Sequence, residues 1–181
     1  MKTTILSEDT IFENKAVATI GFFDGVHRGH QFLLKHVVDL AHENGMESMA
    51  ITFDKHPRQV LNADYQPQLL TTLDDKLKLL AETGIDHCVV LPFTKVLAVL
   101  SAYDFMDNIM RTKLGVATLL IGYDNRFGHN RSETFADYVR YGKEMGIEVV
   151  QNTALDVEGI MVSSSVVRRL ISNGDVETAA K

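Results

Sequence analysis

Short apolar runs rich in β-branched residues alternate along this chain with amphipathic segments that end at glycine. Glycine adopts the left-handed conformation at a helix C terminus without steric cost, so each of these glycines predicts the end of a helix. The helix-ending glycines are Gly45, Gly84, Gly115 and Gly146. The apolar runs, interpreted as strands, cover residues 16–21, 49–53, 88–91, 117–121 and 147–150. This regular alternation leaves few ways to fold.

The predicted strands are apolar on both faces, which is typical of parallel strands covered by helices on each side. The sequence therefore predicts an α/β fold with a Rossmann-like, doubly wound parallel sheet and right-handed crossovers. At 181 residues the chain fits one domain with a substantial core and is too short for two domains of ordinary size. Ligands of such sheets bind beyond the carboxyl ends of the strands, so we expect the site there.

Composition counts against several classes of protein. Hydrophobic residues make up 45% of the chain and charged residues 23%, and no apolar run is long enough to cross a bilayer. The net charge of -6 argues against a broad nucleic-acid-binding face, which needs clustered Lys and Arg. Residues 1–14 lack the pattern of a secretory signal, and the lone Cys88 cannot form an internal disulfide. We expect a cytoplasmic protein with neither a membrane nor a nucleic-acid partner.

Residues 21–31 lie where the first predicted strand turns into the first predicted helix. The N terminus of that helix offers unpaired amides and a partial positive charge to an anion. Gly29 has no side chain to obstruct a phosphate, and His27 and His30 can donate hydrogen bonds to its oxygens. The alternatives are a chance pair of histidines, or a metal site with Asp24 as a third ligand. The surrounding glycines and the preceding strand favour phosphate binding.

The segment after the second predicted strand places polar groups at the same edge of the sheet. His56, Pro57 and Arg58 belong to it, and they can line the site of an acceptor substrate. The alternative is an ordinary loop that Pro57 stiffens and whose polar side chains are solvated. A long irregular stretch follows over residues 62–72, and we interpret it as a loop.

Two later segments also carry candidate nucleotide contacts. Residues 122–131 mix an acid, aromatic residues and arginines, a combination that can grip a nucleotide, although Tyr123 and Phe127 fit equally well as core residues. Serines at 163–165 stand at a predicted helix start, with an arginine about one turn later. Capping explains one serine, but three followed by an arginine favour a second phosphate clamp. Neither a Walker A loop nor a dinucleotide Gly-x-Gly-x-x-Gly follows the first strand, which counts against kinases and dehydrogenases.

The four segments, in this order, resemble the FAD synthetase module of bacterial bifunctional riboflavin kinase/FMN adenylyltransferase, a nucleotidyltransferase of the HxGH type. The family pattern Gly-x-Phe-Asp-Gly-x-His-x-Gly-His-Gln corresponds to residues 21–31 without a gap. Thr-Phe-x-Pro-His-Pro corresponds to residues 52–57, with Lys55 in place of a proline. Gly-x-Asp-Phe-Arg-Phe-Gly corresponds to residues 122–128, with Asn125 in place of an aromatic residue. Ser-Ser-Thr-x-Ile-Arg corresponds to residues 163–168, with Ser165 and Val167 substituted.

The resemblance implies transfer of AMP from ATP to the phosphate of FMN, giving FAD and pyrophosphate. The FMN phosphate would attack the α-phosphorus in line, with Mg²⁺ held mainly by phosphates and water. The implied catalytic residues are His27, His30 and Arg168. The implied ATP-binding residues are Gly21, Phe22, Phe23, Asp24, Gly29, Asp124, Arg126, Ser163, Ser164 and Ser165. The implied flavin-binding residues are His56, Pro57, Arg58 and Phe127.

Members of this family continue into a riboflavin kinase barrel, for which residues 1–181 leave no room. The resemblance therefore implies an FMN adenylyltransferase domain over the whole chain, adenylylation without kinase activity, and a riboflavin kinase domain C-terminal to it as a partner. Two alternatives stay open. One is a nucleotidyltransferase of the same fold with another nucleotide or acceptor, and the other is a nucleotide- or flavin-binding module without turnover.

Overall fold

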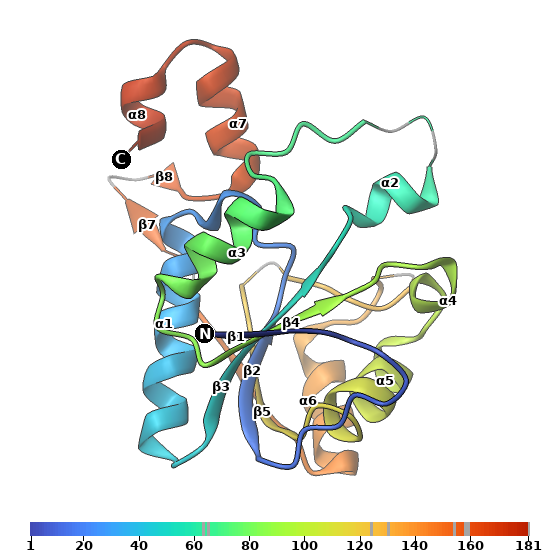
Figure 1. Ribbon diagram of the computed structural model, residues 1–181. Helices are drawn as coiled ribbons and strands as arrows, with labels where there is room; N and C mark the ends of the chain where they lie inside the picture. Colours follow the sequence, from blue (N-terminus) through green and yellow to red (C-terminus); the bar gives the residue numbers. More distant parts are fainter. Residues whose placement is uncertain are drawn as a thin grey trace.

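The computed structural model describes residues 1–62, 64, 66–123, 125–129, 131–153, 155–157 and 160–180. Its centre is a six-stranded, all-parallel sheet in the order β1-β4-β3-β2-β5-β6 (Figure 1). The strands are β1 (Lys2–Ile5), β2 (Ala16–Ile20), β3 (Glu47–Phe53), β4 (His87–Leu91), β5 (Val116–Ile121) and β6 (Glu148–Gln151). A separate antiparallel pair consists of β7 (Asp156–Val157) and β8 (Ile160–Met161).

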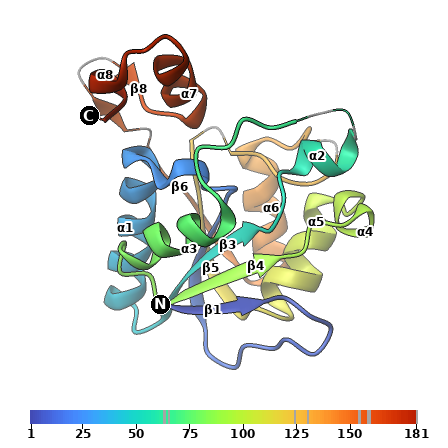
Figure 2. The ribbon, with the colours of Figure 1, turned by 45° about the horizontal axis from the view of Figure 1, so that its top comes forward.

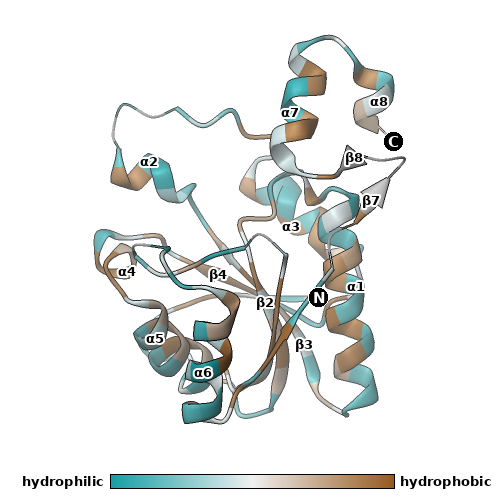
Figure 3. Ribbon diagram, turned by 180° about the vertical axis from the view of Figure 1, so that it is seen from behind, coloured by the Kyte–Doolittle hydropathy of each residue, from teal (hydrophilic) through white to brown (hydrophobic). Residues whose placement is uncertain are grey.

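Helices cover both faces of the sheet. One face packs against α1 (Arg28–Glu43) and α3 (Leu73–Ala81), and the other packs against α5 (Ala102–Asp104), the π-helix η2 (Phe105–Arg111) and α6 (Phe135–Met145) (Figure 1). The remaining helices are η1 (Asp24–Val26), α2 (Pro57–Leu61), α4 (Lys95–Ala98), α7 (Ser164–Ser172) and α8 (Val176–Ala180). Along α1 hydrophobic and hydrophilic residues alternate in Figure 3, as expected for a helix with one buried face.

The central strand β2 feeds both halves of the core. All five of its residues are buried, and successive side chains point to opposite faces of the sheet. Ala18 and Ile20 belong to the cluster that includes η2 and α6. Val17 belongs to the other cluster, with Leu34 and Val37 of α1. This two-sided burial explains why the strand is a continuous apolar run and not an alternating one.

The predicted α/β doubly wound fold is confirmed, and each predicted strand appears within two residues of its expected bounds. Three strands are missing from the prediction. β1 is an edge strand whose residues are mostly exposed, so its sequence carries no apolar run. The β7–β8 pair has only two residues in each strand, which is too short for a periodic signal.

A buried tyrosine fastens the loop that follows β5. The hydroxyl of Tyr138 accepts a hydrogen bond from the Phe127 amide at 3.0 Å and donates one to the Phe127 carbonyl at 2.9 Å. The two rings stack with centroids 4.5 Å apart. Phe127 is therefore a core residue that anchors the loop, which is one of the two roles its sequence position allows.

The carboxyl ends of β2, β5 and β6 face the start of α7, which stands above the sheet next to α8 (Figure 2). At the edge of the sheet where the sequence predicts the site, the carboxyl ends of these strands lie next to the N termini of α1 and α7. Within the described parts of the chain, no helix is both long and apolar enough to cross a bilayer.

Candidate nucleotide-binding site

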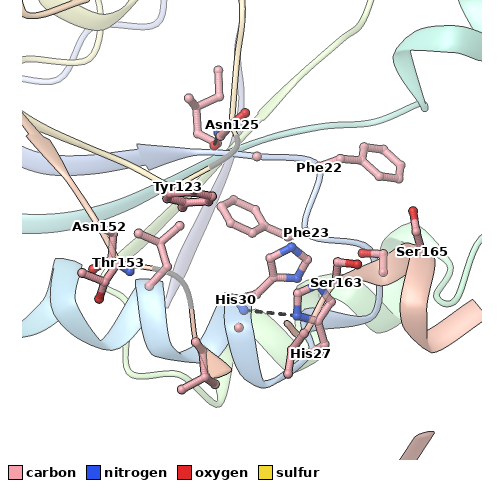
Figure 4. Close-up of a pocket in the computed structure, with 18 of the residues that line it drawn as sticks. Phe22, Phe23, His27, His30, Tyr123, Asn125, Asn152, Thr153, Ser163 and Ser165 are labelled. Atoms are coloured by element: carbon pink, nitrogen blue, oxygen red, sulfur yellow. Dashed lines mark hydrogen bonds between the residues drawn. The ribbon is translucent and has the colours of Figure 1, made fainter. Parts of the chain in front are cut away.

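A cavity of about 500 Å³ opens at the carboxyl ends of β2, β5 and β6 (Figure 4). Its walls come from the turn after β2, the start of α1, the loops after β5 and β6, and the start of α7. Ten of the predicted site residues line it: Gly21, Phe22, Phe23, His27, Gly29, His30, Ser163, Ser164, Ser165 and Arg168. The first and fourth motifs of the sequence, more than 130 positions apart, thus form one site.

The turn between β2 and α1 has an unusual backbone. Phe23 has φ 54° and Val26 has φ 39°, both in the region that side-chain-bearing residues rarely adopt. Gly25, at φ 77°, accepts the same region without strain. The amide of Gly25 donates to Thr71 Oγ1 at 3.1 Å, so a distant segment holds the turn in place. Strained backbone of this kind persists only where its surroundings fix it, and it is concentrated at functional sites.

His27 and His30 form a stacked pair at the start of α1. Their ring centroids are 3.6 Å apart and their planes differ by 20°. The backbone amide of His30 donates to Nδ1 of His27 at 3.3 Å (Figure 4). Because this Nδ1 accepts, a neutral His27 ring carries its proton on Nε2. The helix cap thus also sets the tautomer of a cavity side chain.

The environment of His30 keeps its ring neutral. Burial lowers the pKa of His30 well below its ordinary value of 6.5, and the nearby charges of His27 and Lys76 lower this pKa further. The Phe23 ring makes a T-shaped contact with it, with centroids 5.3 Å apart. Its Nδ1 is enclosed and has no hydrogen-bond partner among the described residues. A buried polar atom without a partner in a cavity is expected where a ligand completes the site.

The N termini of α1 and α7 approach each other at Gly29. A Cβ at this position would lie 3.2 Å from the carbonyl oxygen of Val162 and equally close to the ring of His27. Ser163 caps α7 by accepting the Val166 amide at 3.3 Å. Two helix N termini facing one cavity present two sets of amides and two partial positive charges. This arrangement suits a ligand with several phosphates.

Asp24 has a different position from the one its motif predicts. The prediction places it among the ATP-binding residues, whereas its buried side chain lies outside the cavity lining. Its carboxylate accepts the backbone amides of Leu70 and Thr71 at 3.0 and 3.1 Å. It also pairs with Arg168, whose Nη1 lies 3.3 Å from Oδ2. Asp24 therefore fixes the segment at residues 70–71 and orients the Arg168 guanidinium without itself lining the cavity.

Five more predicted residues lie away from the cavity, and a sixth cannot be placed. Arg126 is exposed outside the lining, and Phe127 is in the core as described above. His56 is outside the lining but contacts the ring of Phe22, with centroids 5.0 Å apart, and burial together with Arg58 lowers the pKa of His56. Pro57 and Arg58 begin α2 next to it. Asp124 lies outside the described residues.

Several residues that the motifs did not single out complete the lining. Asn125 lines the cavity, and its side-chain amide donates to the carbonyl of Ile20. Asn152 follows β6 directly, and its Oδ1 lies 2.6 Å from Nδ1 of His36. Its place after a predicted strand is a signal that could have found it. Arg131 also lines the cavity, with φ 52°, a backbone feature that no sequence pattern reveals.

No group of three or more His, Cys, Asp or Glu side chains suited to a metal ion occurs in the described portion of the chain. The alternative in which His27, His30 and Asp24 form a metal site therefore has no support from the geometry. The Asp24 carboxylate faces the amides of residues 70–71 and the Arg168 guanidinium, not the two imidazoles.

A doubly wound sheet in which two helix N termini and a histidine pair border one cavity is the arrangement typical of α/β domains that bind nucleotides through their phosphates. The family model for FAD synthetase matches residues 9–166, so the chain belongs to the FAD synthetase family. This confirms the resemblance that the four motifs indicate.

Curated relatives show the same kinship. The bifunctional riboflavin kinase/FMN adenylyltransferase of Escherichia coli (strain K12) is 32% identical over 163 residues, which cover 90% of this chain and 52% of that protein. The protein of the same name from Listeria monocytogenes is 36% identical over 170 residues, covering 92% of this chain and 52% of that protein. The chain thus spans about half the length of the curated relatives it matches.

A solved structure supports the fold. The crystal structure described as a macrolide-efflux protein from Streptococcus pneumoniae aligns with a TM-score of 0.84 and 24% identity. The alignment covers 98% of this chain and 58% of that one. At this level of identity the likeness concerns the fold alone.

The position of Arg131 generates a prediction about nucleotide affinity. Arg131→Ala should raise the Kd for ATP about 10-fold or more, because a charge-assisted hydrogen bond to phosphate contributes about 1.5–3 kcal/mol. Arg126→Ala is the matched control, since Arg126 is exposed and outside the cavity lining, and the substitution keeps the carbonyl that accepts from Arg131 Nε. Isothermal titration of both variants measures the difference. A larger loss for Arg126→Ala would restore the original assignment.

Proposed function

We propose that this chain transfers AMP from ATP to the phosphate of FMN, giving FAD and pyrophosphate. The observation that carries the proposal is the convergence of the α1 and α7 N termini on one cavity, with the stacked His27 and His30 between them. Membership of the FAD synthetase family selects adenylyl transfer to FMN among the reactions that such a phosphate site can serve.

The residues of the cavity divide the work of holding the triphosphate. The amides at the start of α1 and α7 and the guanidinium of Arg168 bind phosphate oxygens as fixed donors. Arg168 is held by Asp24 at 3.3 Å and by the Gln68 carbonyl at 3.5 Å, so its head group is directed before the substrate arrives. Fixed donors of this kind stabilise developing charge without having to reorganise during the reaction.

The reaction needs no nucleophile from the protein. An oxygen of the FMN phosphate forms the new bond to the α-phosphorus, and the bond from that phosphorus to the pyrophosphate oxygen breaks. Negative charge develops on the leaving pyrophosphate, and a neutral His30 donates a hydrogen bond to the phosphoryl oxygens. The lowered pKa of His30 suits this role as a donor that is not a cation at neutral pH.

The acceptor flavin belongs on the β3 side of the turn. Phe22 lines the cavity and also contacts the ring of His56. His56, Pro57 and Arg58 follow β3 and therefore reach the same edge of the sheet as the cavity. An FMN molecule bound against this segment would bring its phosphate past Phe22 towards the α-phosphorus. Phe127, buried at 8% exposure, is not part of this acceptor surface.

Mg²⁺ would enter with ATP and would supply charge neutralisation of the phosphates. The polar cavity of backbone amides, serine and arginine fits a ligand that brings its own metal. We also propose that a riboflavin kinase domain works together with this domain. The curated relatives are bifunctional, and this chain matches about half of each. A cytoplasmic location is consistent with a reaction that consumes ATP.

The proposed reaction predicts a sharp difference between two flavins. The chain with ATP and Mg²⁺ should convert FMN into FAD with release of pyrophosphate. Riboflavin should give no adenylylated product, because it lacks the phosphate that acts as the nucleophile. Chromatography of the products together with a pyrophosphate assay measures both results. FMN binding without any FAD would indicate a binding module, and adenylylation of a different phosphate acceptor would indicate another transferase of the same fold.

His30 should act in the transition state. His30→Ala should lower kcat by roughly 10²–10³-fold, the usual cost of removing one preorganised donor, with little change in FMN affinity. Steady-state kinetics and titration with FMN measure the two quantities. A folded His30→Ala protein with near-normal kcat would remove this residue from the mechanism.

His42→Ala is the matched control for this variant. His42 lies in the last turn of the same helix, is exposed, and is outside the cavity lining. The His42→Ala variant should therefore keep the kcat of the wild type. The melting temperature of both variants separates a loss of catalysis from a loss of helix packing.

A further inference from the structure

A fully buried lysine lies beneath the turn that leads into the cavity. Lys76, in the first half of α3, is only 3% exposed. Its Nζ donates to the carbonyls of Phe22 at 3.1 Å and Phe53 at 2.9 Å, and to Thr52 Oγ1 at 3.1 Å. An ammonium group has three protons, and each of them has an acceptor here.

These hydrogen bonds join two strand ends. Phe22 belongs to the turn after β2, and Thr52 and Phe53 end β3. Thr52 Oγ1 itself donates to the Phe22 carbonyl at 3.1 Å, so Thr52 and Phe22 are joined both directly and through the ammonium group. The Lys76 Nζ also lies 4.3 Å from the centroid of the Phe22 ring. The ammonium therefore fixes both the backbone and the ring of a residue that separates the cavity from the segment after β3.

Holding a charge in this place is unfavourable in itself. Burial lowers the pKa of Lys76 from 10.5 to about 8, opposed by the nearby Cys88, Asp24 and Asp54. Apolar side chains of similar size often replace buried charges without loss of stability, so stability alone does not explain an ammonium here. Local violations of this kind are expected at functional sites.

We propose that Lys76 is a positioning residue for adenylyl transfer, which aligns the acceptor side of the site with the bound ATP by fixing Phe22 to the end of β3. The inference rests on the proposed function, because it concerns the approach of the FMN phosphate to the α-phosphorus. Reacting atoms must be held about 3–3.5 Å apart and aligned, and a displacement of about 1 Å can cost about 10²-fold in rate.

The proposal predicts opposite pH dependences for activity and stability. Above about pH 8 the Lys76 ammonium loses a proton, and with it one of three hydrogen bonds, so kcat should fall as pH rises from 7.5 to 9. The unfolded chain keeps this proton up to about 10.5, so between these values it binds more protons than the folded chain. The contribution of Lys76 to the free energy of unfolding therefore rises while kcat falls. Because the lowered pKa makes this contribution to stability rise, a fall in kcat over the same pH range cannot come from a loss of folded protein through Lys76.

The other charged groups that face Lys76 do not explain such a fall. Burial raises the pKa of the Cys88 thiol to about 11, above this range. The pKa of His30 is lowered, so that ring titrates on the acid side. The acidic residues that face the ammonium are Asp24 and Asp54, whose charges favour its protonated form.

The test compares Lys76→Met with Lys78→Met in kcat, ATP Kd and melting temperature. Lys78 is on the same helix, with a side chain that is 75% exposed and paired with Asp75 at 3.2 Å. Lys76→Met should lower kcat at saturating substrates at least 10-fold, with the ATP Kd within about 3-fold of the wild type, and it should remove the fall in kcat above pH 8. Lys78→Met should match the wild type throughout.

The possible outcomes separate the role of Lys76 from the proposed function. A folded Lys76→Met protein with unchanged kcat, or a wild-type kcat that stays constant from pH 7.5 to 9, would overturn the inference while leaving the proposed function intact. If Lys76→Met does not fold, the wild-type pH profile alone makes this decision. No FAD from either the wild type or Lys78→Met would overturn the proposed function, and the inference with it.

Discussion

The buried carboxylate of Asp24 holds together three segments that are far apart in the sequence. It accepts the amides of Leu70 and Thr71 and pairs with Arg168, while the carbonyl of Asp24 accepts from the Ser164 hydroxyl at 3.1 Å. The strained turn after β2, the segment before α3 and the start of α7 are thereby fixed to one another. Without these contacts the left-handed Phe23 and Val26 would have little to maintain them. The two helix N termini face one cavity because this residue joins them.

The electrostatics of the site follow from burial as much as from charge. The chain carries a net charge of -6, yet the cavity is lined by Arg131, Arg168 and the amides of two helices. Beneath the turn, Lys76 adds a desolvated cation, and this cation lowers the pKa of His30. A neutral histidine beside fixed positive groups can donate to a phosphate without taking up a proton. The local field thus favours a polyphosphate although the protein as a whole repels anions.

The sequence predicts the framework of this site well and its interior less well. Glycine-ended helices and two-sided apolar strands determine the sheet, and the sheet determines where His27, Gly29 and Ser163 meet. Side-chain direction within a loop is not encoded in this way. Arg126 and Arg131 look equivalent in sequence, and only the backbone of the loop decides which one lines the cavity.

Two other residues show the same limit of sequence reasoning. Asp24 belongs to a motif expected to bind ATP, but its partners are amides 46 and 47 positions away. Lys76 lies in an ordinary amphipathic helix, and its burial depends on the tertiary packing of α3 against the ends of β2 and β3. Its hydrogen bonds to Phe22 and Phe53 cannot be foreseen from the periodicity of the helix.

The most direct test of this account is a crystal structure of the protein with Mg²⁺ and α,β-methylene ATP, whose α–β bridge resists cleavage. The account predicts that the phosphates lie between the N termini of α1 and α7, in contact with His27 and Arg168, with the α-phosphorus turned towards Phe22. A nucleotide bound outside this cavity, or one with its base and not its phosphates between the two helices, would contradict it.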